Sequence, residues 1–408
     1  MRSCLRAMMR PTVVGLFLGG LGIAGAAEPP ARLPEGVLTL ERAVQLGLAH
    51  HPGLDRSRSR VAEAEASLRR STADYRPRLY AEGVYRQGRQ AGGDDEGEFS
   101  DDSEARLTLE QEIYDFGGRA AARRAARRDR GAAQLTLFDA RQKRVLAIRR
   151  AFYDVLLAER QTQIWNEAMA VAFVRFDYGQ GREELGDISP VDKAQRESRF
   201  RRLRGNYREA QWDAREARVE LGHAMGLTDA IPGNLADPDL ALDRELPDVK
   251  DLRDRAWEAN PRLRAARRKL QAARAGVAEA RGQLRPRIVA EITAKEEARQ
   301  SPYANTLEAG IRLEAPLYEG GDLRGAVDEA RARLLQERAR VRELRQTVED
   351  EALLSYNGMI TSTFELLTDV RQKLSASLEA ANAKREFYLA EADLTGIFEH
   401  YMDEGEGD

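Results

Sequence analysis

The sequence has little of what cross-links or fills a compact globular core. It contains one cysteine in 408 residues, and aromatic residues make up 6% of the chain. The cysteine, Cys4, precedes an N-terminal apolar run that we expect to be removed, so the mature chain has no disulfide and no cysteine metal ligand. No later stretch has the ~20 consecutive apolar residues of a spanning helix, which excludes a polytopic helical membrane protein.

Proline is also sparse, and it is absent from residues 119–189 and after Pro316. These stretches are rich in Ala, Arg, Glu and Leu, which are good helix formers. We predict a helix of ~65 residues, about 100 Å long, over residues 119–183, and one of similar length over 322–390. Apolar residues recur there in steps of three and four, typical of coiled-coil packing. In the first stretch they are Leu135, Phe138, Val145, Ile148, Phe152 and Val155, with Gln142 filling the one position of the stripe between Phe138 and Val145.

Neither sign of charge is in excess, because 65 Lys and Arg balance 68 Asp and Glu to a net charge of −3. This balance gives no reason to expect a nucleic-acid partner. One dense arginine cluster stands out: Arg123, Arg124, Arg127, Arg128 and Arg130. Since the chain carries an export signal, we expect this cluster to be a solvated helix face near lipid headgroups, with no nucleic acid bound.

The N-terminus has the pattern of a secretory signal peptide. Arg2, Arg6 and Arg10 come before or at the start of an apolar run that reaches Ala24, and small residues follow as far as Ala27. This predicts a signal peptide over residues 1–26, with a membrane anchor as the alternative. Export without disulfides indicates the bacterial periplasm or outer membrane.

Two regions depart from the helical pattern. Apolar or small residues alternate with polar ones over 78–85 and 106–110, and again over 287–295 and 306–315. This alternation predicts two β-hairpins, at about 78–113 and 287–317, each with an apolar and a polar face. Strands of ~10 residues have the length that crosses an outer membrane. A half-buried hairpin of a soluble protein is the alternative.

The two hairpins belong to a longer duplication. His51-Pro52 and Arg76-Pro77-Arg78 recur 209 residues later as Asn260-Pro261 and Arg285-Pro286-Arg287. We therefore expect two structural repeats, 27–226 and 251–408, joined by a linker at 227–250. Strand–helix turns are predicted on each side of each hairpin, where proline stops a helix and glycine permits a sharp turn. The turn residues are Pro77, Gly117, Gly118, Pro286, Gly320 and Gly321.

One chain supplies four strands, which is too few to close a barrel. An open sheet in lipid would leave unpaired edges that the bilayer does not tolerate. If the hairpins enter a membrane, several copies must share one barrel, and three copies supply twelve strands. The apolar face would then meet lipid and the polar face would line water.

Several motifs carry a resemblance to a known family. They are the opening Leu38-Thr-Leu-Glu-Arg-Ala43 with His51-Pro52, the segment Gln111-Glu-Ile-Tyr-Asp-Phe-Gly-Gly118, and its counterpart Glu314-Ala-Pro-Leu-Tyr-Glu-Gly-Gly321. With these motifs the chain resembles the TolC-like outer-membrane factor family. The resemblance implies a mainly α fold with β, in which a homotrimer forms a twelve-stranded outer-membrane barrel above a periplasmic helical tunnel. It implies passive transport with a periplasmic adaptor protein and an inner-membrane transporter as partners, and no cofactor.

The resemblance also implies a gate at the helix tips far from the barrel. The candidates near these tips are Asp187, Asp192, Asp393 and Glu399. Carboxylates at a pore mouth favour cations, although a helix cap is the alternative for Asp187 and Asp192. The second repeat stops shortly after its approach to this tip, so we expect its returning helix to be missing.

Other residues give weaker signals. The acids Asp94, Asp95, Glu96, Asp101 and Asp102 predict an extracellular rim, or merely a solvated loop. No nucleophile, phosphate-binding or metal-binding motif is present, so we expect no enzymatic activity. Two alternatives to an exit duct stay open: a soluble periplasmic coiled-coil scaffold or adaptor, and a truncated, non-functional family member.

Overall fold

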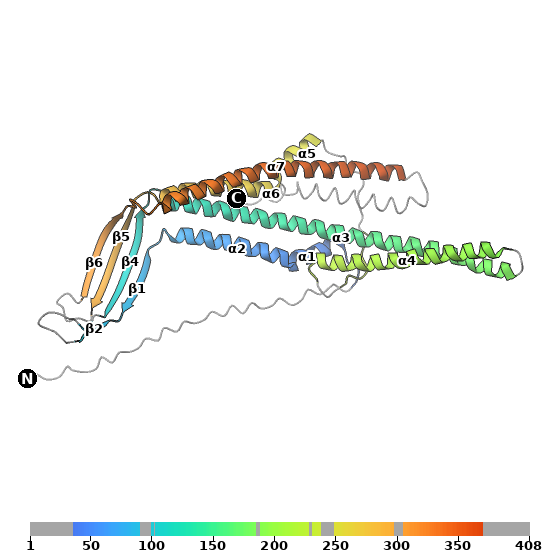
Figure 1. Ribbon diagram of the computed structural model, residues 1–408, viewed down its shortest axis with the longest axis horizontal. Coiled ribbons are helices and arrows are strands. Elements are labelled where there is room, and N and C mark those ends of the chain that lie inside the picture. Colours follow the sequence, from blue (N-terminus) through green and yellow to red (C-terminus); the bar gives the residue numbers. More distant parts are fainter. Residues whose placement is uncertain are drawn as a thin grey trace, which may run out of the picture.

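The computed structural model of the chain describes residues 36–89, 99–101, 103–184, 188–227, 231–237, 249–297 and 305–369. In these residues a layer of long helices carries a small β-sheet at one end (Figure 1). The predicted signal peptide at 1–26, and the chain end where a returning helix was expected to be missing, lie outside the described residues.

Four helices make up the layer that meets the sheet. In order across the layer they are α2 (Pro52–Ala73), α3 (Gly118–Glu184), α6 (Pro261–Gly282) and α7 (Asp322–Asp369). Helix α3 has 67 residues, about 100 Å at 1.5 Å per residue, as the proline-free stretch predicts. No helix within the described ranges combines the length and the low charge needed to cross a bilayer.

Three further helices lie away from the sheet. Helix α4 (Pro190–Ala224) returns antiparallel along the far half of α3. The short helices α1 (Leu40–His50) and α5 (Val249–Ala259) pack on α3 and α7, respectively, near the middle of the layer (Figure 1). Each structural repeat therefore places one short helix against its longest helix.

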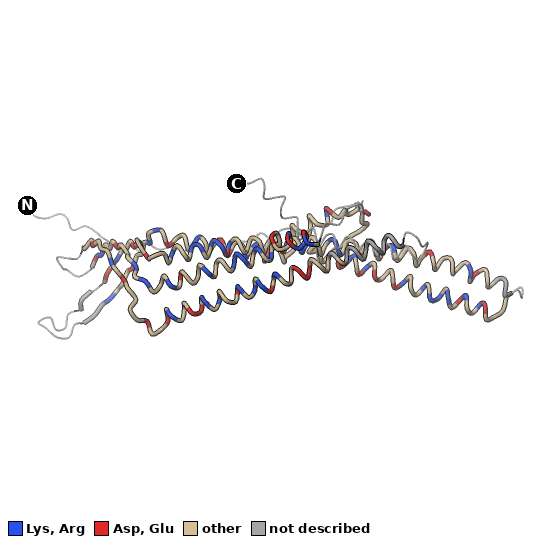
Figure 2. The backbone as a smooth tube through the Cα atoms, turned by 90° about the horizontal axis from the view of Figure 1, so that it is seen from above, with Lys and Arg blue, Asp and Glu red and all other residues tan. Residues whose placement is uncertain are grey.

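The main core lies where α1, α3 and α4 meet. Ile148, Phe152 and Val155 of the predicted heptad stripe are fully buried there, together with Leu221 and Met225. A smaller cluster joins α5 to α7 through Ala256, Val348 and Ala352. The narrow apolar stripes are thus the surfaces on which the helices pack. Charged residues of both signs occur along the length of the helices (Figure 2).

The four expected strands form one antiparallel sheet in the order β1-β4-β5-β6. The strands are β1 (Arg78–Val84), β4 (Glu104–Tyr114), β5 (Arg287–Glu297) and β6 (Asn305–Glu314). Strands β4 and β5, from different repeats, pair in the centre, whereas β1 and β6 form the two edges. The two predicted repeats therefore contribute their strands to one continuous sheet.

Each strand of this sheet is joined directly to one helix of the layer. Strand β1 follows α2 and β5 follows α6, while β4 leads into α3 and β6 leads into α7. The strand order β1-β4-β5-β6 therefore matches the helix order α2-α3-α6-α7 (Figure 1). The sheet and the helical layer consequently share the same two lateral edges.

The segment between β1 and β4 corrects one prediction. The acids between Asp94 and Asp102 were expected to lie in a loop, but β2 (Gln87–Arg89) pairs with β3 (Phe99–Asp101) in a two-stranded ribbon. Asp101, predicted as a loop acid, therefore lies in a strand, where it pairs with Gln87. The prediction was wrong because backbone hydrogen bonds hold this ribbon, and its Gly- and Asp-containing sequence has low β-propensity.

The two helices that lead into the sheet begin with equivalent caps. The His51 Nδ1 accepts a hydrogen bond from the Gly53 N–H at 3.0 Å at the start of α2. The Asn260 Oδ1 accepts hydrogen bonds from the Arg262 and Leu263 N–H groups at the start of α6. A proline follows each cap, where its missing N–H costs nothing.

Candidate functional site

One face of the sheet is apolar across all four strands. Leu79, Leu109, Ile292 and Ala309 form one cross-strand row on this face. The next row on the same face runs Ala81, Leu107, Ala294 and Leu307. The apolar side chains on this face are exposed, by as much as 76% for Leu307. Such a contiguous exposed patch needs an apolar environment or a partner.

The opposite face of the sheet is polar. Its central row is Tyr80, Thr108, Thr293 and Glu308. Oppositely charged side chains pair across it, as in the ion pair between Arg312 of β6 and Glu291 of β5. Lys295 reaches Glu104 of the neighbouring strand at 3.6 Å. This face suits contact with water, so the sheet separates an apolar side from an aqueous side.

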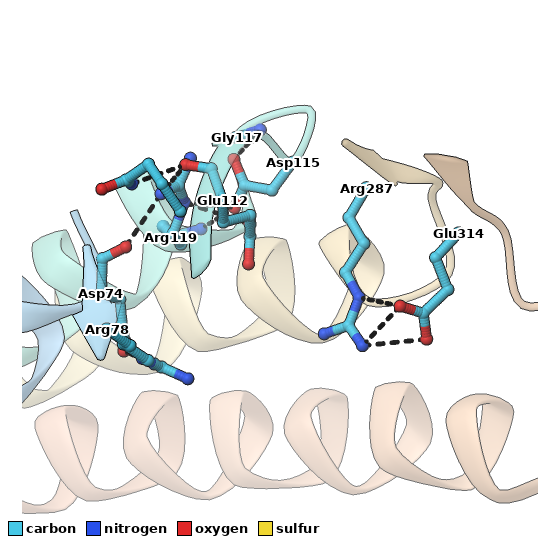
Figure 3. A network of polar contacts seen from close by, with 9 residues as sticks. Asp74, Arg78, Glu112, Asp115, Gly117, Arg119, Arg287 and Glu314 are labelled. Atoms are coloured by element: carbon cyan, nitrogen blue, oxygen red, sulfur yellow. Dashed lines mark hydrogen bonds and ion pairs between the residues drawn. The ribbon is translucent and has the colours of Figure 1, made fainter. Parts of the chain in front are cut away.

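Arg119 connects three elements at the base of the first hairpin (Figure 3). Its guanidinium donates to the backbone oxygens of Asp74 and Glu112, each at 2.9 Å, and forms an ion pair with the Glu112 carboxylate at 3.1 Å. It also lies over the Tyr75 ring, 4.9 Å from the ring centroid. The end of α2, the end of β4 and the start of α3 are thereby held by one side chain.

The strand–helix turn itself is closed by Asp115. This carboxylate accepts hydrogen bonds from the backbone N–H groups of Gly117 and Arg119 (Figure 3). Positive φ angles occur at Phe116 (55°) and Gly117 (94°), but Gly118 already belongs to the helix. In the second repeat Gly320 and Gly321 both take positive φ. Glycine is favoured at these positions because it adopts this backbone conformation without strain.

Gly118 was predicted as a turn residue, but it makes a close contact between two helices. It contacts Gly282, the last residue of α6, so closely that a Cβ on Gly282 would lie 2.7 Å from the Gly118 Cα. Arg285, just beyond, donates to the Phe116 backbone oxygen at 3.2 Å. The two repeats are therefore in direct contact at their strand–helix junctions, through this glycine pair and this hydrogen bond.

The second junction uses a different ion pair. Arg287 at the start of β5 donates two hydrogen bonds of 2.9 Å to the carboxylate of Glu314 at the end of β6 (Figure 3). Both residues are about half exposed, so this pair fixes the register of the strands more than it stabilises them.

A groove continues from the polar face of the sheet along α3, α6 and α7. Directly below the sheet it is lined by Glu112, Glu279 and Glu314, and further along by Asp129, Glu279 and Glu337. Burial raises the pKa of the Glu279 carboxyl above its ordinary value. Burial also raises the pKa of Asp129, although Lys269 opposes this rise. Carboxylates therefore outnumber basic side chains along this groove, although Arg285, Arg287, Lys269 and Arg333 also line it.

The far tip, where α3 turns into α4, holds one gate candidate. The Ser189 hydroxyl accepts from the Asp192 N–H at 3.1 Å and donates to the Asp192 carboxylate at 2.8 Å. Ser189 is therefore the helix cap, and Asp192 completes it from the first turn of α4. Phe176 stacks on Phe200 of α4, and Phe173 packs against the same ring at a tilt of 54°, which joins the two helices.

The remaining predicted site residues fall into two groups. Pro77 and Pro286 lie between a helix and a strand. Several other candidates lie outside the described residues: Asp94, Asp95, Glu96, Asp102, Asp187, Asp393 and Glu399. Sequence reasoning missed the roles of Arg119 and Gly282, although each stands next to a predicted turn motif. Within the described ranges no group of three His, Cys, Asp or Glu side chains could hold a metal ion.

Comparisons with known proteins agree with this arrangement. Residues 43–227 and 252–393 match the family described as outer membrane efflux protein. Protein CyaE of Bordetella pertussis is 26% identical over 366 residues, which cover 87% of this chain and 74% of that protein. The alkaline protease secretion protein AprF of Pseudomonas aeruginosa is 25% identical over 346 residues, covering 75% of this chain and 69% of that protein.

Solved structures share the fold. The outer-membrane channel OprN superposes with a TM-score of 0.74 at 17% identity, over 88% of this chain and 89% of that one. The Campylobacter jejuni CmeC outer membrane channel gives a TM-score of 0.70 at 14% identity, over 88% and 85% of the two chains. The predicted fold class, mainly α with two β-hairpins joined to long helices, is confirmed.

Proposed function

Because this chain belongs to the outer membrane efflux protein family, we propose that three copies join their sheets into one exit duct through the bacterial outer membrane. Each copy contributes four strands to a twelve-stranded barrel, and its helices extend into the periplasm as a tunnel. Transport through such a duct is passive. A periplasmic adaptor protein and an inner-membrane transporter are its partners, and the transporter supplies the energy.

The two-faced sheet is the observation that carries this proposal. Its strands β4, β5 and β6 have 10 or 11 residues, the length that spans an outer membrane at the usual tilt. Its apolar face is exposed, and ion pairs join neighbouring strands on its polar face. Its edge strands β1 and β6 need partners, because lipid does not satisfy open backbone groups. Copies of the same chain supply those partners in a closed ring.

The alternative of a soluble periplasmic scaffold explains these features less well. A soluble hairpin pair would bury its apolar face, whereas Leu307, Ile311 and Leu313 are each exposed by 68% or more. In water this patch would cause aggregation. The family to which the chain belongs is also one of channel proteins and not of enzymes.

The cargo is a finer part of the proposal. The name of AprF assigns that protein to alkaline protease secretion, and AprF is similar to this chain over most of its length. We therefore favour a polypeptide cargo, delivered by a secretion-type transporter, over small molecules. The test expresses the chain with the matching transporter and adaptor in a host that lacks its own ducts. We expect this host to export a reporter polypeptide and to gain no drug resistance.

Membrane fractionation tests the duct itself. The full precursor would be expressed in a Gram-negative host, and outer-membrane fractions would be run on SDS gels with and without boiling. We expect a trimer before boiling, a monomer after it, and ion conductance once the trimer is added to a planar bilayer. A monomer released by osmotic shock would refute the duct and favour the scaffold.

A further inference from the structure

Two of the helices next to the sheet, α3 and α6, carry a concentration of positive charge. Residues 118–131 of α3 and all of α6 together contain thirteen Arg or Lys and two acids. The two acids are Asp129 and Glu279, and both line the groove on the water-facing side. Of the thirteen basic residues, Arg119 and Lys269 also line the groove. The other eleven are not among its lining residues, so most of the positive charge must be sought on the other sides of these helices.

Helical geometry places one row of arginines opposite the groove. Along α6 and at its C-cap the groove is lined by residues such as Lys269, Gly276 and Gln283. With a rotation of about 100° per residue, Arg274 and Arg281 project about 140° to 160° away from them. Both arginine side chains are exposed. They therefore lie on the side that continues the apolar face of the sheet.

The same reasoning applies to α3 and α7. Arg124 projects about 130° from the groove-lining side of α3, and Arg324 about 165° from that of α7. Both side chains are exposed. We call Arg124, Arg281 and Arg324 the basic collar. Within the described ranges none of the three forms an ion pair with a carboxylate of the chain.

The basic collar lies at the level where the sheet ends. Each of its arginines is within about 10 Å of the helix end that adjoins the sheet, at 1.5 Å per residue. At this level Tyr114, the last residue of β4, is exposed by 50%. Between β6 and α7, Leu317 is exposed by 95% and Tyr318 by 87%. Exposed tyrosines at the end of an apolar strand face mark a membrane–water interface.

These observations indicate one kind of partner. The headgroup region of a bilayer is roughly 5–7 Å thick on each side of the hydrocarbon core, and arginine extends its charge by several ångströms on its apolar stem. We propose that the basic collar binds the phosphate groups of anionic phospholipids in the leaflet on the helical side of the membrane. In a trimer, nine arginines then surround the duct at headgroup depth.

The chain supplies its own control set. Arg141 of α3, Arg267 of α6 and Arg338 of α7 are also exposed and lie outside the groove, and we call them the distal set. They lie about 22 to 35 Å from the sheet-side ends of their helices. This is too far for contact with headgroups, so the distal set controls for loss of charge alone.

The test uses the purified full-length trimer in zwitterionic detergent. Its dissociation temperature would be measured with added phosphatidylglycerol, with phosphatidylcholine, and with inorganic phosphate. We expect phosphatidylglycerol alone to raise the temperature, and 0.5 M salt to weaken the effect because the attraction is screened. Replacement of the basic collar by glutamine should abolish the rise, while the same change in the distal set should leave it intact.

The apparent affinity gives a quantitative measure. Each arginine near an anionic surface strengthens attachment about fivefold, so Arg281→Gln alone should weaken phosphatidylglycerol binding by about that factor or more. Lysine at all three collar positions should retain most of the binding, since charge is the main requirement. If the triple glutamine variant does not assemble, Arg281→Gln and the lysine variant decide the question.

Several results would overturn the proposal. One is a dissociation temperature that rises equally with phosphatidylcholine, or a rise that inorganic phosphate reproduces in full. Another is a rise with phosphatidylglycerol that persists in the collar variant. A third is a rise that is lost equally in the distal variant. The proposal rests on the proposed function, because the sheet must lie in the membrane. If that premise fails, no membrane trimer forms at all, whereas failure of the collar proposal leaves a trimer without selectivity for the lipid.

Discussion

The Cα of Gly118 and the backbone of Gly282 lie in direct contact, so the first residue of α3 touches the last residue of α6. This contact joins the two repeats at the base of the sheet. A side chain at position 282 would meet backbone atoms, which cannot rotate away as a flexible side chain can.

Gly282→Ala should therefore destabilise the junction. We expect a loss of about 1–3 kcal/mol, typical of overpacking, seen as a lower dissociation temperature of the trimer. The matched control is Gly276→Ala in the same helix, where a Cβ meets nothing within 4 Å. That variant should be neutral or gain up to about 1 kcal/mol from helix propensity. Equal effects of the two variants would contradict the close contact.

Replacement of Arg119 should loosen the base of the first hairpin. Its side chain is 13% exposed and satisfies two backbone oxygens and the Glu112 carboxylate. Arg119→Met leaves these groups without their donor, at a cost of about 3 kcal/mol or more. Arg119→Lys keeps the charge but not the planar fork, so it should recover only part of the loss. Full recovery by lysine, measured as trimer yield on unboiled gels, would argue against the multiple contacts.

Position His51 should make the stability of the helical layer depend on pH. Burial, and then the nearby Arg144, lower the pKa of His51 below its ordinary value, while Asp55 opposes this. A lowered pKa in the folded state means that the cap is intact above the unfolded-state pKa of about 6.5 and is lost as pH falls through the folded-state pKa. Protonated Nδ1 can no longer accept from the Gly53 N–H.

The second repeat suggests the matched variant, because Asn260 caps α6 in the equivalent position. His51→Asn should keep the cap and remove this part of the pH dependence. Urea-induced unfolding at pH 7.5 and 5 would measure it, and we expect the wild type to lose more stability than the variant. The same loss in both proteins would exclude His51 as the cause.

Removing the charge of Glu279 should stabilise the folded chain at neutral pH. Burial raises the folded-state pKa of this carboxyl above its unfolded-state value. The sign follows from linkage: relative stability is highest below the unfolded-state pKa and falls as pH rises through the folded-state pKa. Glu279→Gln should thus unfold at higher urea concentration than the wild type at pH 7.5, with the gap closing near pH 4. Glu63→Gln on α2 serves as the control.

The two faces of the sheet can be distinguished by adjacent residues of β4. Leu109 lies on the apolar face and Thr108 on the polar face. Leu109→Arg should cost about 2–4 kcal/mol if it faces lipid near the middle of the bilayer, and trimer in the outer membrane should fall sharply. Thr108→Arg places the same charge towards water and should assemble. The opposite ranking would mean that the faces have been assigned the wrong way round.

Much of the fold follows from periodicity in the sequence. Ile148, Phe152 and Val155 were chosen by their spacing alone and are fully buried, because a heptad stripe has one way to bury itself. Alternation likewise predicted which residues of β5 share a face. Features of this kind can be predicted from neighbouring residues alone, because they do not depend on distant parts of the chain.

The candidate site was less predictable because its contacts join distant segments. Arg119 meets Asp74 from 45 residues away, and Arg285 reaches Phe116 from 169 residues away. Arg119 directly follows the Gly117-Gly118 turn motif, but no local pattern indicates which distant groups it contacts. The cap at the tip was partly visible, since Ser189 precedes Pro190 and stands three residues before Asp192, a spacing typical of a helix start.

The direct joining of each strand to one helix has a consequence for assembly. When two copies meet edge to edge, a slip that keeps the apolar face outward must shift the strands by two residues, about 6.6–6.8 Å. Packing between the attached helices repeats at about 5.4 Å, one turn. The two intervals do not coincide, so a slipped sheet would force its helices out of their packing. Helix packing therefore excludes slipped strand registers in the barrel. Only one alignment of neighbouring copies satisfies both the strand pairing and the helix packing.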